Sequence, residues 1–230
     1  MSSMENTSSA IPVIAIDGPG GSGKGTIAQR LARSLGWNFL DSGALYRLTA
    51  LAVMKTQTPV DDTIALGKLA ADLDIRFELT AEGSRALLDG DDVSDILRAE
   101  NTGILASQVA VVPAVRAALV KRQKLFRQAP GLVADGRDMG TVIFPDAILK
   151  IFLTANAEIR AQRRYKQLKE KGESVNLSRL FREIKARDLR DQSRNIAPLR
   201  PAEDAVIIDS SDLSIDEVFG MICELLDDTL

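Results

Sequence analysis

Residues 11–35, IPVIAIDGPGGSGKGTIAQRLARSL, decide the fold class of this chain. Gly18 is followed by four residues and then by Gly23 and Lys24, which is the spacing of a phosphate-binding P-loop. Glycines allow successive backbone N–H groups to turn toward phosphate oxygens, and the following helix presents its positive N-terminal end to the same anion. An apolar run before the loop predicts a strand, and an amphipathic pattern after it predicts a helix, so the motif stands in the context that it requires.

The spacing alone would occur by chance in roughly one chain in fifteen of this length, and the alternative explanation is a flexible glycine turn. The flanking strand and helix favour the P-loop. We therefore expect Lys24 to place a mobile charge on the outer phosphates of ATP. The P-loop contacts phosphates rather than the base, so the sequence leaves GTP open as a donor. The predicted ATP-binding set is Gly18, Pro19, Gly20, Gly21, Ser22, Gly23, Lys24, Gly25 and Thr26.

Magnesium is the expected cofactor of such a loop. In many P-loop NTPases the hydroxyl directly after the lysine ligates Mg²⁺. Here that position is Gly25, and the first hydroxyl is on Thr26. Thr26 is therefore the nearest candidate ligand, acting directly or through a water molecule.

Composition restricts the chemistry. The 230 residues are 45% hydrophobic with a formal net charge of -3, which predicts one domain with a full core and no basic field for a nucleic acid polymer or a membrane. The single cysteine, Cys223, excludes an internal disulfide, and no apolar stretch approaches the ~20 residues that span a bilayer. Because the chain has no histidine, its chemistry must use carboxylates, arginines, Lys24 and a hydrated cation.

The polar residues 1–10 lack the order of a signal peptide and predict a disordered leader. We expect a cytoplasmic protein. A monomer is also expected, since the sequence contains no evident exposed apolar stripe.

The remaining pattern predicts an α/β fold. Apolar runs at 13–16, 38–40, 132–134, 148–153 and 206–208 predict a five-stranded parallel sheet wrapped by helices. Helical patterns cover 26–35, 43–54, 62–72 and a long segment, 102–126. Alternation over 75–79 and a return at 86–88 predict a small antiparallel β insertion.

Aspartates follow several predicted strands: Asp17, Asp41, Asp135 and Asp209. In open α/β sheets, ligands bind at the carboxyl ends of the strands. Aspartate is also common in turns and helix caps, and capping is the favoured interpretation for Asp209. Three Asp/Arg clusters lie at 41–47, 135–141 and 187–194. By itself, the helical cluster 187–194 fits a solvated face of ion pairs. Together the three clusters predict a site for an anionic acceptor, because the planar arginine fork matches phosphate oxygens.

Four segments, DGPGGSGKGT, DSGALYR, VADGRDMGTVIFPDAILKIFL and RDLRDQSRNIAPLRPAEDAVIIDSS, resemble in this order and spacing the bacterial cytidylate kinases, from about residue 12 to the C-terminal helix. The resemblance implies the P-loop nucleoside monophosphate kinase fold and transfer of the γ-phosphoryl group of ATP to CMP and dCMP. It also implies a single kinase domain, 11–230, with a core of 11–60, 102–158 and 181–230. A monophosphate-binding insertion at about 61–101 and a short helical lid at about 159–180 complete that domain.

The resemblance also implies roles for individual residues, which would contact the cytosine, the ribose or the acceptor phosphate. The CMP-binding set is Ser42, Tyr46, Arg47, Ser107, Arg116, Arg137, Asp138, Arg187, Asp191 and Arg194. A smaller set would stabilise the transferring phosphoryl group, with two members on the lid. These catalytic residues are Lys24, Arg137, Arg163, Arg164 and Arg194.

Two other classes of function remain as alternatives. The nearest is a kinase of the same fold that acts on UMP, AMP or a small metabolite such as shikimate. The other is a non-enzymatic P-loop switch, which would leave the acceptor-side arginines without a purpose.

Overall fold

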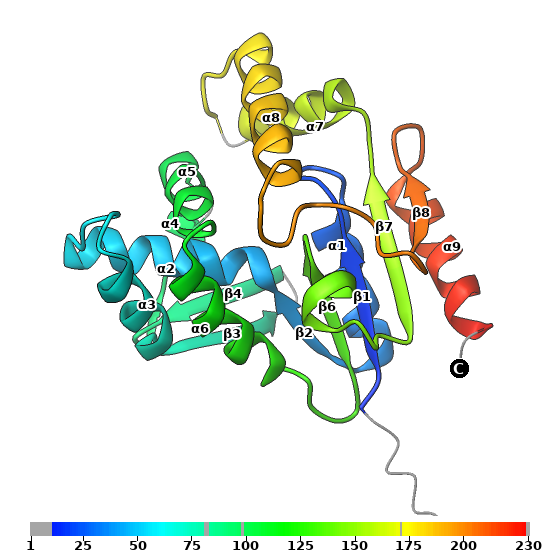
Figure 1. The fold of residues 1–230 in the computed structure, drawn as a ribbon. Coiled ribbons are helices and arrows are strands. Elements are labelled where there is room, and N and C mark those ends of the chain that lie inside the picture. The colour runs from blue at the N-terminus through cyan, green and yellow to red at the C-terminus, as the bar shows by residue number, and fades with distance from the viewer. Residues whose placement is uncertain (1–10, 81–82, 98, 171, 229–230) are drawn as a thin grey trace, which may run out of the picture.

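A five-stranded parallel sheet forms the centre of the computed structural model, with strands in the order β2-β6-β1-β7-β8 (Figure 1). The structure describes residues 11–80, 83–97, 99–170 and 172–228, so the predicted leader at 1–10 lies outside the described residues. All five predicted strands are confirmed, with ends that shift by one or two residues. They are β1 (Val13–Asp17), β2 (Asn38–Asp41), β6 (Leu132–Gly136), β7 (Leu149–Thr154) and β8 (Val206–Asp209).

Both faces of the sheet are buried under helices, as expected for a parallel sheet. Along β1, Val13 and Ala15 point into one hydrophobic cluster, whereas Ile14 and Ile16 point into the other. The helices are α1 (Lys24–Leu35), α2 (Ser42–Thr56), α3 (Thr63–Asp72), α4 (Ser94–Leu97), α5 (Glu100–Val109), α6 (Pro113–Lys124), α7 (Ala157–Glu170), α8 (Leu177–Gln192) and α9 (Ile215–Asp227), with a π-helical turn, η1 (Met139–Ile143).

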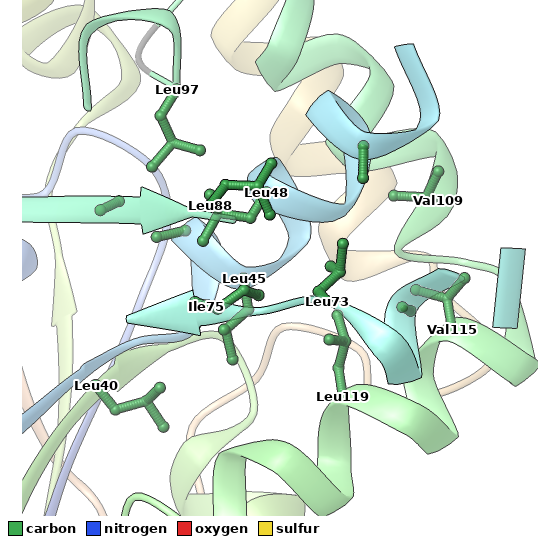
Figure 2. Close-up of a cluster of buried hydrophobic side chains, with 14 of the residues drawn as sticks. Leu40, Leu45, Leu48, Leu73, Ile75, Leu88, Leu97, Val109, Val115 and Leu119 are labelled. Atoms are coloured by element: carbon green, nitrogen blue, oxygen red, sulfur yellow. The ribbon is translucent and has the colours of Figure 1, made fainter. Parts of the chain in front are cut away.

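One of these clusters joins the insertion to the core (Figure 2). Leu40 of β2 and Leu45 and Leu48 of α2 share it with Leu73 and Leu88 of the insertion. In this cluster, the insertion and the rest of the domain therefore bury their apolar side chains together. Its position beside α2 is fixed by the same apolar burial that holds α2 on the sheet.

The insertion contains the predicted antiparallel hairpin. Strand β3 (Ile75–Thr80) pairs with β4 (Gly83–Leu88), with Ile75 opposite Leu88 and Phe77 opposite Ala86. Residues 81–82 of the predicted turn lie outside the described residues. A short third strand, β5 (Asp91–Asp92), follows β4 and was not predicted.

The predicted helical segment 102–126 is two helices rather than one. Helices α5 and α6 are bent by 99° at the break before Pro113. Proline has no N–H group for a helix interior, and it restricts the residue before it to extended conformations. Val112 has a ψ of 118°, and Pro113 begins α6 at the first helical position. No single helix within the described part of the chain is long and apolar enough to cross a membrane.

Helices α7 and α8 pack on each other above the P-loop end of the sheet (Figure 1). The predicted lid, about 159–180, covers most of α7, the connection to α8 and the first turn of α8. Helix α8 continues without a break to Gln192. Its C-terminal half therefore brings the arginine- and aspartate-rich segment 187–194 down toward the P-loop.

Candidate active site

A cleft of about 1660 Å³ lies at the carboxyl ends of the strands. Its walls come from the P-loop, the start of α2, the helices α5 to α8 and the loop after β6. Most of the predicted site residues line it. They are Gly20, Gly21, Gly23, Lys24, Gly25, Thr26, Ser42, Tyr46, Arg47, Ser107, Arg116, Arg137, Asp138, Arg163, Arg164, Arg187, Asp191 and Arg194.

The other three predicted residues, Gly18, Pro19 and Ser22, belong to the P-loop but do not line the cleft. At Gly18 the φ angle is 152°, and a Cβ there would lie 2.0 Å from the carbonyl oxygen of Leu153 on β7. Only glycine fits that approach. The carbonyl oxygen of Ser22 accepts a hydrogen bond of 3.0 Å from Ser210 Oγ. The P-loop is therefore held against β7 and against the loop that follows β8.

Lys24 is buried at the floor of the P-loop. Its Nζ donates to the carbonyl oxygen of Pro19 at 3.2 Å and lies 3.8 Å from Asp135 Oδ1. Burial, together with the nearby Arg137, lowers the pKa of Lys24 to about 8, and burial raises the pKa of Asp135 to about 7. Both groups are poorly solvated in this structure, so each would gain from an additional partner of opposite charge.

Asp135 and Thr26 supply oxygen atoms next to Gly25, the donor type that Mg²⁺ prefers. A Cβ at Gly25 would lie 3.0 Å from Asp135 Oδ2, and Thr26 is exposed to the cleft one residue further on. Within the described ranges, no group of three or more acidic or cysteine side chains gathers that could hold a metal alone. Mg²⁺ suits such a site, because it keeps several waters and takes one or two carboxylates together with substrate phosphates.

The opposite wall of the cleft carries a buried ion pair. Arg116 Nη2 donates to Asp138 Oδ2, and Arg116 Nη1 donates to the hydroxyl of Tyr46 at 3.3 Å. Ser107 lines the same wall, and its hydroxyl donates to the carbonyl oxygen of Gly103 within α5. A carboxylate and a guanidinium are thus presented side by side, which suits an edge with one donor and one acceptor.

Asp191 is the centre of an arginine cluster. It accepts from Arg137 Nε at 3.0 Å and from Arg194 Nη2, and Arg187 Nε lies 4.0 Å away. Burial alone would raise the pKa of Asp191, but the arginines, Arg137 first, hold it below its ordinary value. The Nε atoms of Arg187 and Arg194 are buried and have no hydrogen-bond partner among the described residues. Three cations around one carboxylate leave an excess of positive charge for an anion.

The arginine cluster meets the P-loop at Gly20. A Cβ there would lie 3.5 Å from Arg137 Nη2 and 3.6 Å from Arg187 Nη1. The carbonyl oxygen of Gly20 accepts from Arg160 Nη1 at 3.1 Å, and the same nitrogen donates to Asp188 Oδ1 at 3.0 Å. The P-loop and the arginine cluster therefore form one continuous surface.

The two predicted lid cations, Arg163 and Arg164, lie on α7. Arg163 is anchored by the loop after β8, where its Nη2 donates to the carbonyl oxygen of Ser210 at 2.6 Å and its Nη1 lies 3.2 Å from Ser210 Oγ. Arg164 lines the cleft. Arg47, on α2, donates to the carbonyl oxygen of Leu97 at 2.8 Å and so ties α2 to the insertion.

Three residues of this site were not predicted as site residues. Asp135 was predicted as an aspartate at a strand end and as part of the Asp/Arg cluster 135–141, but no role was assigned to it; parallel pairing places it beside Asp41. Arg160 and Asp188 are 28 residues apart and lie on different helices, so their contact leaves no signal in the sequence.

A sequence model of the cytidylate kinases matches residues 14–228. The chain belongs to the cytidylate kinase family. It is 60% identical over 213 residues to the cytidylate kinase of Pseudomonas fluorescens (strain Pf0-1), covering 92% of this chain and 93% of that protein. It is 57% identical over 207 residues to the cytidylate kinase of Aeromonas hydrophila, covering 90% of each.

A solved structure of an uncharacterized protein from Eubacterium ventriosum superimposes on 94% of this chain and 98% of that one, with a TM-score of 0.50 and 13% identity, which shows the fold alone. Membership of the cytidylate kinase family confirms the predicted enzyme class, a nucleotide-binding P-loop phosphotransferase. The parallel sheet with its small antiparallel insertion confirms the predicted fold class. The roles of individual residues stay predictions.

Proposed function

We propose that this protein transfers the γ-phosphoryl group of ATP to CMP and dCMP, giving ADP and CDP or dCDP. The observation that carries the proposal is the junction at Gly20, where Arg137 and Arg187 reach the P-loop while they surround Asp191. A donor phosphate in the loop and an acceptor phosphate among the arginines would share these cations. That arrangement serves phosphoryl transfer between two bound anions.

The acceptor base would be recognised by the ion pair of Arg116 and Asp138. Cytosine presents an amino group that donates at position 4 beside a ring nitrogen that accepts. A carboxylate next to a guanidinium matches that order, whereas uracil presents a carbonyl oxygen at position 4. Ser42 and Ser107 line the same cleft and limit its size. Tyr46 and Arg47 would help to orient the acceptor phosphate from α2.

The chemical step needs little from a general base. The acceptor phosphate is already largely dianionic near pH 7, since its second pKa is about 6. One of its oxygens would form the new bond to the γ-phosphorus as the bond to the bridging oxygen of ADP breaks. Lys24, the P-loop N–H groups, Arg137 and Arg194 would stabilise the charge on the transferring group. Arg163 and Arg164 would approach the triphosphate from α7, and their closure would exclude water.

Magnesium is part of the proposal as the cofactor. Thr26 and Asp135 would hold it, with Thr26 acting directly or through water. When bound, Mg²⁺ would neutralise part of the negative charge of the donor phosphates. ATP as the donor, a monomer and a cytoplasmic location also stay predictions.

A coupled assay of ADP release tests the proposal, with ATP and magnesium and with CMP, dCMP, UMP, AMP and GMP offered in parallel. We expect strong turnover with CMP and dCMP only. Turnover with UMP or AMP instead would favour the alternative kinases of this fold. Binding of ATP with no turnover of any acceptor would refute the acceptor half of the proposal.

A further inference from the structure

Asp17, the last residue of β1, is a buried carboxylate to which the proposed mechanism assigns no role. Its residue is 5% exposed. Its Oδ1 accepts from the backbone N–H of Met139 at 2.9 Å, and its Oδ2 accepts from that of Gly140 at 2.8 Å. No ion pair of Asp17 with a lysine or arginine occurs among the residues that the structure describes. Both oxygens are therefore used to hold backbone.

This position requires a side chain that supplies two acceptor oxygens. Met139 and Gly140 begin η1 directly after Arg137 and Asp138, and their N–H groups belong to the orphan donors of that turn. A carboxylate offers one oxygen to each N–H, whereas an asparagine offers only one. Burial raises the pKa of Asp17 to about 6, partly offset by these two hydrogen bonds. A neutral apolar residue would avoid that desolvation but would leave two buried N–H groups unpaired.

The contact joins the two halves of the cleft. On one side Asp17 immediately precedes Gly18 of the P-loop, and β1 pairs with β6 with Asp17 opposite Gly136. On the other side Gly140 is packed against Lys150 of β7, since a Cβ at Gly140 would lie 3.2 Å from Lys150 Cγ. The backbone after Arg137 and Asp138 is thus clamped between Asp17 and Lys150. Any shift at Asp17 would move the side chains of Arg137 and Asp138 relative to the P-loop.

We infer that Asp17 is a positioning residue for phosphoryl transfer, which fixes the loop of Arg137 and Asp138 at its working distance from the P-loop. This inference rests on the proposed function, because Arg137 and Asp138 are its acceptor-side residues. Asp17 itself touches neither nucleotide in this scheme.

The Asp17→Asn variant tests the inference by steady-state kinetics. The amide keeps one acceptor oxygen but turns an NH₂ group toward the second backbone N–H. We expect KM for CMP to rise about tenfold and kcat to fall about tenfold, while KM for ATP stays within about twofold. ATP binding is spared because the P-loop is held separately, by Gly18 against Leu153 and by Ser210 on Ser22.

Asp62→Asn is the matched control. Asp62 Oδ1 also accepts a backbone N–H, that of Ala65 at 2.9 Å, but the residue is exposed and does not line the cleft. Its kcat and both KM values should stay within about twofold of the natural protein. A merely structural role for Asp17 would lower kcat with the folded fraction and leave both KM values unchanged, which would overturn the inference. An equal rise of KM for ATP and for CMP would overturn it as well.

Amide exchange in the natural protein supplies a test that needs neither turnover nor the variant. The N–H groups of Met139 and Gly140 should exchange at least about a hundredfold more slowly than in an unstructured chain. Exchange at the unstructured rate would overturn the inference. Protected amides with no turnover of CMP would instead count against the proposed function alone.

Discussion

The cleft has a proposed donor half at the P-loop and a proposed acceptor half at the arginine cluster, and the two halves are built by different means. The donor half is made of backbone from one contiguous loop, with Lys24 and Asp135 as its buried charges, 3.8 Å apart. The acceptor half is made of side chains from several elements, joined by close ion pairs such as Arg116 with Asp138 and Arg137 with Asp191. The charges of the donor half are desolvated and weakly paired, whereas those of the acceptor half already have partners.

The two halves also differ in their electrostatic state before a ligand binds. Burial moves the pKa of Lys24 down and that of Asp135 up, so the donor half is poised to accept phosphates and a cation. In the acceptor half, Asp191 holds Arg137 and Arg194 in place through hydrogen bonds. A rigid backbone cradle thus faces a preorganised set of cations.

The largest effect is expected when the donor half loses its lysine. In Lys24→Met, kcat with CMP should fall about 10³-fold, because the charge on the outer phosphates is lost. The affinity for CMP, measured by calorimetry without ATP, should stay within about threefold, since the acceptor arginines keep their carboxylate partners. Lys68→Met, at an exposed position of α3, is the control and should change neither. A large loss of CMP affinity would break the separation of the two halves.

A smaller effect, confined to the acceptor half, is expected when Asp191 is changed. In Asp191→Asn, Arg137 and Arg194 lose the carboxylate that orients them, so KM for CMP should rise about fiftyfold. KM for ATP should stay within about threefold, which steady-state kinetics with each substrate varied in turn would measure. Equal changes in the two KM values would show that Asp191 also supports the donor half.

The two buried ion pairs should differ in the coupling free energy that a double-mutant cycle measures. We expect a coupling free energy below about 1 kcal/mol for Lys24→Met with Asp135→Asn, and of about 2–3 kcal/mol for Arg116→Met with Asp138→Asn. The first pair is 3.8 Å apart and desolvated, whereas the second is in hydrogen-bond contact and shares Tyr46. Urea unfolding at pH 7.5 would give both values, and similar couplings would contradict the comparison.

The smallest effect is expected at Ser210, which supports the P-loop through one hydroxyl. In Ser210→Ala, the hydrogen bonds from Oγ to the carbonyl oxygens of Ser22 and Thr154 are lost. KM for ATP should rise about threefold, with KM for CMP unchanged. Among the described residues, the hydroxyl of Ser34 donates only to the carbonyl oxygen of Leu31 in its own helix, so Ser34→Ala should leave both KM values as they are. A rise of KM for CMP in Ser210→Ala would argue against a purely donor-side role.

Much of the fold follows from local patterns, and the misses have identifiable causes. The five strands were predicted because buried parallel strands are short continuous apolar runs. The break between α5 and α6 was missed, although Pro113 marks it, because the apolar pattern continues on both sides of the proline. The roles of Asp17 and Asp135 were missed because aspartates at strand ends are common and only their partners distinguish them.

The sequence by itself determined the P-loop, since the glycine-rich residues 18–23 between β1 and α1 set its geometry through glycine conformations and helix N–H groups. The tertiary structure decided which carboxylate meets which arginine. Arg137 reaches Asp191 across 54 residues, and Arg116 reaches Asp138 across 22 residues. Such pairs depend on how α6 packs on α3 and how α8 packs on α7, and that packing depends on many residues rather than on any one motif.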